Sequence, residues 1–447
     1  MNTVNLFIDK RLVAFVSLLI AGLFAACSED EAVAPDKNSP PEVVFTVAAL
    51  AVPRNTDGVT LSVSATDPDG DDVSVLWEIT RGVLTASQQG NPSINWKTPT
   101  TTGRETITVT ASDGKGGTTT LVETIMVGTV KQSGTSSSEP WTVTNSPYII
   151  RPSGDQNVRF LISNVVLNVE AGSELLLDAE DLEIVLEGTL RTSGTLENPV
   201  VIRPNIRHPE SGYWKGITAI PNSSVPRIEL AYTDLLYATE AAKTTTGGEI
   251  VLDGCRIMFA AEAAVLHQSF ASLSVINSIL TNNVRSGIRI ECSSNVHFPP
   301  TVVVSNDSIA VNGDVSGATP YVDQAAIYIE MADSFATSDI QITNNEISRN
   351  AFPAIQLVGA SRPDIRDNAI FFNELGKQTI PRFNIRLDDG FGGGVSGMID
   401  ARQNYWGAPY TNPATDSLLI QDAIRDSTDV RSISVRVAIY PWLNAKP

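Results

Sequence analysis

A short phrase recurs along the second half of the chain, and its spacing constrains the fold more than any other feature. Residues 228–235 align with residues 250–257 at an offset of 22, and we align these with residues 272–279 at the same offset. Four later copies follow at offsets of 30, 38, 23 and 36, and they end at Ile309, Ile347, Ile370 and Trp406. A minimum near 22 with variable excess is typical of a solenoid whose coils stack while loops grow outward from its corners.

The repeated phrase carries an asparagine just before its isoleucine in most later copies. A stacked asparagine can form hydrogen bonds with backbone groups at a corner and with the equivalent asparagine of the next coil, about 4.8 Å along the stack. We place the start of this ladder at Asn277, where the two earlier coils carry Thr233 and Cys255. The pattern predicts an all-β chain in which residues 141–447 form a parallel β-helix.

Longer phrases add a resemblance to a known superfamily. Residues 164–204 and 211–217, and later "MIDARQNYWGAP" (398–409) and "YPWL" (440–443), follow one another in a set order. Together they resemble bacterial right-handed β-helix proteins of the pectin-lyase-like superfamily, over about residues 148–443. The resemblance implies that Trp214, Trp406 and Trp442 are packing or end-capping residues. It also implies that residues 417–425 form a helix or loop that covers the last coil.

The segment 42–128 has a different pattern of short alternating strands separated by Asp, Gly and Pro turns, which indicates a small β-sandwich. The phrases "ATDPDGDDVSVLWEI" (65–79) and "TITVTASDGKGG" (106–117) resemble the PKD and cadherin-like group of immunoglobulin-type modules. We expect Trp77 and Trp96 to lie in its core. The Gly-, Ser- and Thr-rich residues 129–140 are predicted to be a flexible linker to the β-helix.

Three aspartates alternate in one turn of this module: Asp67, Asp69 and Asp71. With Glu78 at the twelfth position they invite an EF-hand interpretation, but Asp72 stands where that loop needs glycine. An Asp-rich hairpin turn is the better account. Weak calcium binding there stays open, and we expect no other cofactor.

The amino terminus has the pattern of an export signal. Two basic residues precede the apolar run 12–26, which is short for a membrane span. The run ends in "LFAAC" at Cys27, which resembles the lipobox of bacterial lipoproteins, although Phe24 stands where leucine is more usual. The resemblance implies a signal peptide over residues 1–26 and lipidation of Cys27. The alternatives are an ordinary cleaved signal or a buried helix.

Residues 27–41 form an acidic, Pro-bearing tether. The cluster "SEDE" directly after Cys27 looks like the tag that sends some lipoproteins to the outer face of the outer membrane, and a plain solvated linker is the alternative. We therefore expect an outer-membrane lipoprotein at the cell surface, with a periplasm-facing position as the other option. The lipid anchor would be its only contact with a membrane.

Composition limits the partners and the chemistry. A formal net charge of −19 argues against binding nucleic acid or anionic lipid by general electrostatics. Three cysteines cannot build a disulfide framework, and Cys255 and Cys292 are expected to be buried packing residues. The three histidines have no metal-ligand spacing, so a zinc site is not expected.

One strand in each later coil marks the candidate functional face. Period-two alternation points its Ile and Leu side chains inward, so the intervening residues point outward in two rows. One row contains Arg289, Tyr328, Gln356 and Arg386, and the neighbouring row contains Glu291, Glu330, Val358 and Asp388, with Asp389 beside it. Insertions at residues 292–300, 313–323, 331–338, 374–381 and 389–397 would wall this polar face.

Arginine, tyrosine and glutamine suit sugar hydroxyls and carboxylates. The alternative is a solvated sheet face with balanced charges across the coils. The resemblance also raises the question of an enzyme. Of the polygalacturonase-like signature only Asp388-Asp389 is present, and neither a methylesterase-like phrase nor a lyase-like set of calcium carboxylates beside a basic residue is evident.

The sequence therefore favours a lipoprotein whose β-helix binds an extracellular ligand, expected to be a carbohydrate, without catalysis. The alternative from another class is a polysaccharide lyase or hydrolase that uses the acids of these two rows, Glu291, Glu330, Asp388 and the adjacent Asp389, with Arg289 or Arg386. A third alternative is a structural or adhesive role with surface proteins as partners.

Overall fold

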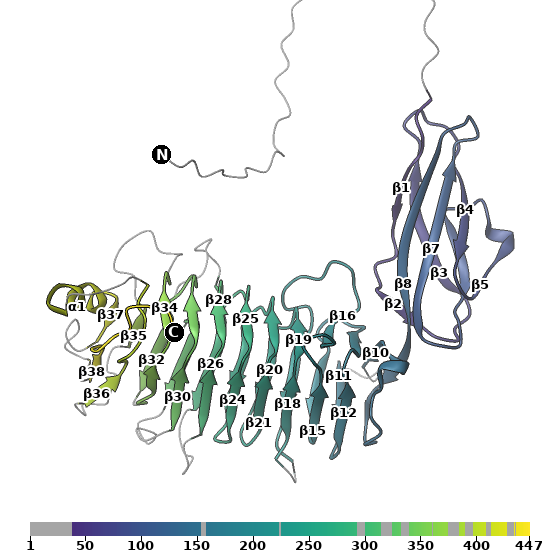
Figure 1. Ribbon diagram of the computed structural model, residues 1–447. Coiled ribbons are helices and arrows are strands. Elements are labelled where there is room, and N and C mark those ends of the chain that lie inside the picture. The colour runs from purple at the N-terminus through teal and green to yellow at the C-terminus, as the bar shows by residue number, and fades with distance from the viewer. Residues whose placement is uncertain are drawn as a thin grey trace, which may run out of the picture.

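A computed structural model describes residues 38–152, 158–222, 225–292, 300–313, 324–331, 339–359, 361–373, 384–388, 397–407, 413–426, 433 and 435–447. Strands dominate these residues, and they form a small sandwich that stands on one end of a long parallel β-helix (Figure 1). The predicted fold class is confirmed.

The sandwich consists of two sheets with Trp77 and Trp96 buried between them, as predicted. One sheet has the order β1-β3-β6-β5, and the other joins β4, β7 and β8 antiparallel with β2 parallel to β8. The strands are β1 (Glu42–Phe45), β2 (Ala51–Pro53), β3 (Val59–Thr66), β4 (Ser74–Ile79), β5 (Val83–Leu84), β6 (Ser93–Lys97), β7 (Gly103–Ser112) and β8 (Thr118–Gln132). Two short 3₁₀ turns, η1 (Ala86–Gln88) and η2 (Val143–Asn145), lie in and after the sandwich.

Each coil of the β-helix contributes one strand to each of three parallel sheets, here named in the order in which a coil visits them. The first sheet contains β10 (Tyr148–Arg151), β13 (Glu174–Leu177), β16 (Val200–Pro204), β19 (Thr233–Leu236), β22 (Arg256–Met258), β25 (Ile279–Thr281), β28 (Ser308–Ala310), β31 (Glu346–Ser348) and β34 (Ala369–Phe371).

The second sheet contains β9 (Gly134–Thr135), β11 (Arg159–Ile162), β14 (Glu183–Leu186), β17 (Gly216–Ala219), β20 (Glu240–Thr244), β23 (Ala263–His267), β26 (Ser286–Cys292), β29 (Ile327–Met331), β32 (Ile355–Gly359), β35 (Ile385–Leu387) and β37 (Ile424–Arg425). The third contains β12 (Val166–Glu170), β15 (Thr189–Ser193), β18 (Arg227–Ala231), β21 (Glu249–Asp253), β24 (Leu273–Ile276), β27 (Val302–Ser305), β30 (Ile340–Thr343), β33 (Asp364–Arg366), β36 (Gly397–Asp400) and β38 (Val435–Ala438). Inward side chains of all three sheets form one apolar core from Trp141 to Ile439.

The bend between the third and first sheets explains the repeated phrase and corrects its alignment. A residue with positive φ makes this bend, for example Asn277 (φ 53°), and the residue after it points into the core. Asn277 is therefore exposed and Ser278 takes the inward place, so its coil is offset by 23 residues instead of 22. Leu280, not Ile279, is the buried member of this copy. The predicted start of the ladder at Asn277 is wrong because a left-handed bend residue turns its side chain outward.

The inward residues at this bend form the predicted ladder in the later coils. Asn345 donates from its backbone nitrogen and from Nδ2 to Oδ1 of Asn368, at 2.9 and 3.0 Å, and Asn368 does the same to Asn404. Asp307 occupies the place before Asn345, because its backbone nitrogen donates to Asn345 Oδ1 at 2.9 Å. Its own Oδ1 accepts from the backbone nitrogen of Ser278. The ladder thus ties consecutive coils together inside the core.

A second ladder, which the sequence analysis missed, lies at the bend between the first and second sheets. Asn283, Asn312, Asn350 and Asn373 are buried and bond Nδ2 to Oδ1 from coil to coil at 2.8, 3.0 and 2.9 Å. Each again follows a residue with positive φ. At both bends a left-handed residue is therefore followed by an inward one, and in the later coils that inward residue is an asparagine.

The sandwich and the β-helix share a sheet. The end of β8 pairs in parallel with β10, so that Thr129 to Gln132 run beside Tyr148 to Arg151, and β9 pairs with β11. Trp141 forms a parallel bridge with Val169 in the third sheet. The prediction of a flexible linker over 129–140 is wrong because much of it pairs with the first coil.

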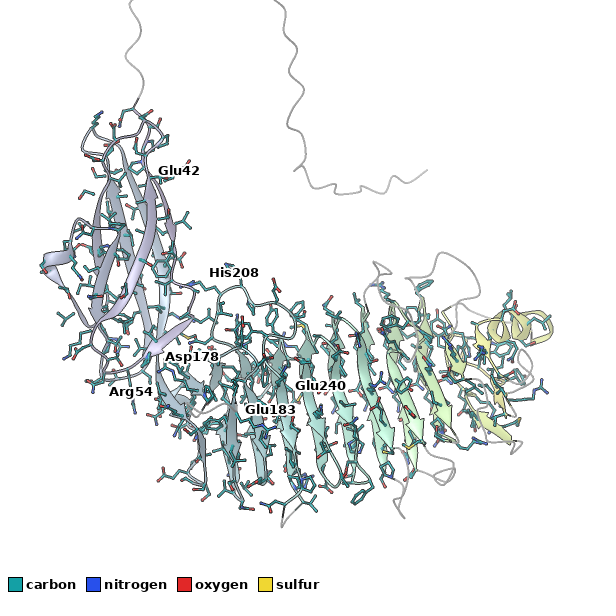
Figure 2. The ribbon with its side chains drawn as sticks, turned by 180° about the vertical axis from the view of Figure 1, so that it is seen from behind. Glu42, Arg54, Asp178, Glu183, His208 and Glu240 are labelled. Atoms are coloured by element: carbon teal, nitrogen blue, oxygen red, sulfur yellow. The ribbon has the colours of Figure 1, made fainter. Side chains whose placement is uncertain are left out.

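Side chains reinforce this junction. Asn205 binds the backbone of Ala51 through both amide atoms, at 2.8 and 3.0 Å, and Arg207 donates to the carbonyl oxygen of Thr124 at 2.7 Å. Figure 2 shows the junction from behind, with Arg54 on the sandwich and Asp178 and His208 on the β-helix. The two units are therefore joined by backbone pairing and by polar contacts.

The other end of the β-helix carries helix α1 (Pro413–Gln421), whose Ile420 is buried in the core cluster. Trp442 packs partly buried against the same cluster. This agrees with the expected cover over the last coil. Trp214 and Trp406 are buried as well, as expected for packing residues.

Candidate functional site

The two predicted outward rows exist in the second sheet. Strand pairing aligns Arg289 with Tyr328, then with Gln356 and Arg386, and it aligns Glu291 with Glu330 and Val358. Asp388 follows β35 and its backbone nitrogen donates to Leu357, which places it in the second row. We call these two rows the strip. The register is set by the alternating isoleucines, since Ile288, Ile327, Ile355 and Ile385 stack in the core.

A network of charged and polar groups occupies the start of the strip. The guanidinium of Arg289 lies 4.4 Å from the centre of the Tyr328 ring, and Arg289 also pairs with Glu291. The Tyr328 hydroxyl donates to Glu330 at 3.0 Å. Gln268 in the preceding coil donates to Glu291 at 2.8 Å. Every side chain here is held by a neighbour in the same coil or the next.

A second group of contacts lies at the other end of the strip. Gln356 Nε2 donates to Asp388 Oδ1 at 3.1 Å, and Arg386 Nε lies 3.4 Å from the same oxygen. Gln356 Oε1 is buried and has no hydrogen-bond partner among the described residues. A buried amide oxygen without a donor is unfavourable, so this atom is a candidate acceptor for a ligand or a water molecule.

Burial varies along the strip. Tyr328 and Gln356 are buried, whereas the side chains of Arg289, Glu291, Arg386 and Asp388 are 20–28% exposed. Because Tyr328 and Gln356 are buried, the middle of the strip is not a solvated sheet face. Nor are the charges of its described residues balanced, since two arginines stand against three carboxylates. The insertions predicted to wall the strip lie largely outside the described residues, and so does Asp389.

The Asp-rich turn of the sandwich is built from local hydrogen bonds. Asp67 Oδ1 accepts from the backbone nitrogens of Asp69 and Asp71 at 2.8 and 3.3 Å, and Asp71 pairs with Lys115. The turn is confirmed, but the hairpin is wrong because the turn joins β3 and β4, which belong to different sheets. Within the described ranges, no group of three or more His, Cys, Asp or Glu side chains is arranged to hold a metal ion.

The two β-helix cysteines are free and buried, as predicted for packing residues. Burial raises the pKa of the Cys255 thiol to about 12 and that of Cys292 to about 11. Neither thiol is activated as a nucleophile, because the thiolate is disfavoured in both places. Cys27 lies outside the described residues. Among the helices that are described, none has the length and apolarity to cross a membrane.

The register of the strip agrees with the prediction, but the predicted rows do not include Gln268. The signal was present, because the same alternation continues one coil earlier in β23, where His267 pairs with Ile290. That register places Leu266 beside Arg289 and Gln268 beside Glu291. The strip therefore begins one coil earlier than predicted, and its first row starts with an apolar residue.

Comparisons with known proteins agree with this architecture. A family model described as a bacterial Ig domain matches residues 38–126, and one described as a right-handed beta helix region matches residues 244–395. No curated protein matches the chain. A solved structure described as a nucleoside hydrolase-related hypothetical protein from Saccharophagus degradans, associated with carbohydrate metabolism, is 22% identical over 20% of this chain and 25% of its own. Its TM-score is 0.17.

Proposed function

Because the chain carries a bacterial Ig domain followed by a right-handed β-helix, we propose that it is a surface lipoprotein whose strip binds an extracellular carbohydrate without cleaving it. The observation that carries this proposal is the strip itself. Donors and acceptors recur there on successive coils about 4.8 Å apart, which suits a ligand built from repeating units. The sequence resemblance to pectin-lyase-like proteins supports a carbohydrate as that ligand.

The contacts favour binding over catalysis. Glu291 and Asp388 are each paired with an arginine, and Glu330 accepts from Tyr328. Carboxylates that already accept hydrogen bonds from neighbours are better suited to orienting those neighbours than to acting as a general acid or base. Arg289 and Arg386 are the partly exposed donors best placed to meet sugar hydroxyls or carboxylates.

Replacing both Arg289 and Arg386 by glutamine is expected to weaken carbohydrate binding at least tenfold, because both partly exposed cations of the strip are lost. Tyr328 is left unchanged, since its ring is buried and its removal would open a cavity. Binding is measured on an array of acidic and neutral glycans. The control replaces Arg191 and Arg366 by glutamine; these arginines are ion-paired and half-exposed on the third sheet.

Undiminished binding by the strip variant, with unchanged binding by the control, would contradict the proposal that the strip binds the carbohydrate. The same proteins are incubated with acidic polysaccharides with and without calcium. We expect no new reducing ends and no unsaturated products. Either product from the unaltered protein, lost in the strip variant, would instead establish a hydrolase or a lyase.

Replacing Cys27 by serine is expected to release the protein from the membrane fraction, because a lipid on that cysteine would be its anchor. Labelling with an alkyne fatty acid should mark the unaltered protein and not the variant. Proteinase added to intact cells should degrade the protein if it faces outward. Equal membrane recovery of both proteins would contradict the lipoprotein proposal.

A further inference from the structure

A separate cavity of about 350 Å³ opens on the first sheet, at the bend where the third sheet passes into it. Tyr232, Gly254 and Asn277 line it from three consecutive bends, and Leu196 lines it from the connection between β15 and β16. The strip lies on the second sheet, so the two places use different faces of the solenoid. The volume falls in the range of small-molecule sites.

Tyr232 is an outlier at this bend. Most residues at this bend have positive φ, namely Gly172, Tyr232, Gly254, Asn277, Asn306, Asn344, Asp367 and Gln403. Pro199 takes the equivalent place between β15 and β16, since Val200 pairs with Thr233. Glycine, asparagine and aspartate tolerate this conformation, whereas a bulky aromatic residue does not favour it. Tyr232 nevertheless has a φ of 42°, and the residue is 37% exposed. Tyr237, Phe259 and Phe372 also have positive φ at the other bend, so this conformation alone assigns no role. Tyr232 differs from them because it lines the cavity.

The ring of Tyr232 is held in place by the glycine one coil later. A Cβ atom at Gly254 would lie 2.7 Å from Cε1 of Tyr232, so the ring lies close against the bare backbone of Gly254. Any side chain at position 254 would push the ring away. The result is a fixed, partly exposed aromatic surface at the edge of the cavity.

Polar groups lie beside this ring. Arg256 binds Asp234 through two nitrogens, with Nε to Oδ1 at 2.7 Å, and its side chain is half-exposed. Asn277 donates from Nδ2 to Asp253 at 2.8 Å, and its Oδ1 has no partner among the described residues. The cavity therefore combines an aromatic face, an exposed leucine and a charge-balanced set of hydrogen-bonding groups.

We propose that this cavity binds a neutral saccharide, with one sugar ring against Tyr232 and its hydroxyls on Arg256 and Asn277. An aromatic ring offers an apolar face with polar groups at its rim, which matches the C–H face and hydroxyl edge of a sugar. Asp234 neutralises Arg256, and the chain carries a net charge of −19, so an acidic sugar is disfavoured. A purely apolar peptide side chain could cover Tyr232 but would form no hydrogen bond with Arg256 or Asn277 beside it.

The deciding variant is Tyr232→Asn, which places at this bend the residue found at positions 277, 306 and 344. Asparagine suits the left-handed backbone, so the variant should fold at least as stably as the unaltered protein. Isothermal titration uses neutral tetrasaccharides of glucose, mannose, galactose and xylose as probes. At least one is expected to bind, and Tyr232→Asn should weaken it at least tenfold.

Three other variants make the result specific. Phe372→Asn changes an exposed aromatic residue that also has positive φ, but at the other bend, and it should bind like the unaltered protein. Asn277→Gly keeps the backbone permissible and removes one hydrogen-bonding group, so a two- to fivefold loss is expected. The double strip variant Arg289→Gln/Arg386→Gln should retain this binding.

The proposal is overturned if none of the tetrasaccharides binds, or if Tyr232→Asn binds as well as the unaltered protein. It is also overturned if a leucine- and phenylalanine-rich peptide binds in a Tyr232-dependent way while the saccharides do not. Loss of tetrasaccharide binding in the strip variant alone would assign the saccharide to the strip, and the cavity would then have no role in it.

Discussion

Replacing Asn368 by alanine is expected to lower the free energy of unfolding of the β-helix by about 4 kcal/mol. Asn368 Nδ2 donates to the Ile342 carbonyl at 2.8 Å, and Asn368 Oδ1 accepts from the backbone and the side chain of Asn345. Alanine would leave two or three buried polar groups unpaired, and each costs about 1–3 kcal/mol. Urea unfolding followed by tryptophan fluorescence measures the loss.

The matched control is Asn344→Gly, one residue before a neighbouring rung of the same ladder. Asn344 is exposed with φ 58°, so glycine keeps its backbone and removes only an outward side chain. A change within about 1 kcal/mol is expected. If Asn368→Ala were as mild as this control, the ladder would be a consequence of the coil geometry and not a source of its stability.

Replacing Asp307 by asparagine is expected to stabilise the β-helix by about 4 kcal/mol at about pH 8 and by less than about 1 kcal/mol at about pH 4. Asp307 is the acidic member of the ladder, and its Oδ2 is buried without a hydrogen-bond partner. The other members carry Nδ2 at this place and donate it to the preceding coil and to the next rung. Asparagine would restore those donors.

The pH dependence follows from the pKa of this carboxyl group. Burial, with a smaller contribution from Asp253, raises the pKa of Asp307 to about 8 from an ordinary value of 3.8. The folded protein therefore keeps a proton that the unfolded chain releases. The stabilising contribution is complete below about pH 3.8, falls as pH rises through this window, and is gone above about pH 8.

Unfolding of both proteins across this pH range gives the test. Burial also lowers the pKa of His267 to about 4, which reduces stability as pH falls below about 6.5 in both proteins. The difference between the two proteins removes this shared effect. Parallel curves, with the same difference at about pH 4 and at about pH 8, would contradict a protonated Asp307.

The architecture could be read from the sequence because a β-helix repeats its constraints. Each coil must bury the same columns of Ile, Leu and Val, so the register of the strip from Arg289 to Arg386 followed from alternation alone. The ladder was harder, because exposed and buried asparagines stand side by side at the bends. In the sequence, Asn277 aligns with the asparagines of the later coils. Only the backbone dihedral angles show that the next residue, Ser278, points inward.

The features that the sequence did not predict depend on contacts between distant segments. Tyr328 and Gln356 alternate outward yet are buried, and alternation says nothing about what covers an outward residue. Residues 129–135 have the composition of a linker, yet β10 and β11 hold part of them in strands. The cavity beside Tyr232 was missed because its walls come from three bends and a connection more than 30 residues away.

The shared strand β8 has a consequence for how this protein could be rearranged in evolution. Its end and β9 complete the first edges of two β-helix sheets, and Trp141 covers part of the third. Unpaired edges of this kind invite association between chains. The Ig domain therefore cannot simply be exchanged for another module. A replacement domain would have to pair its own last strand with the first coil in the same register, or the first edges of the β-helix sheets would be left unpaired.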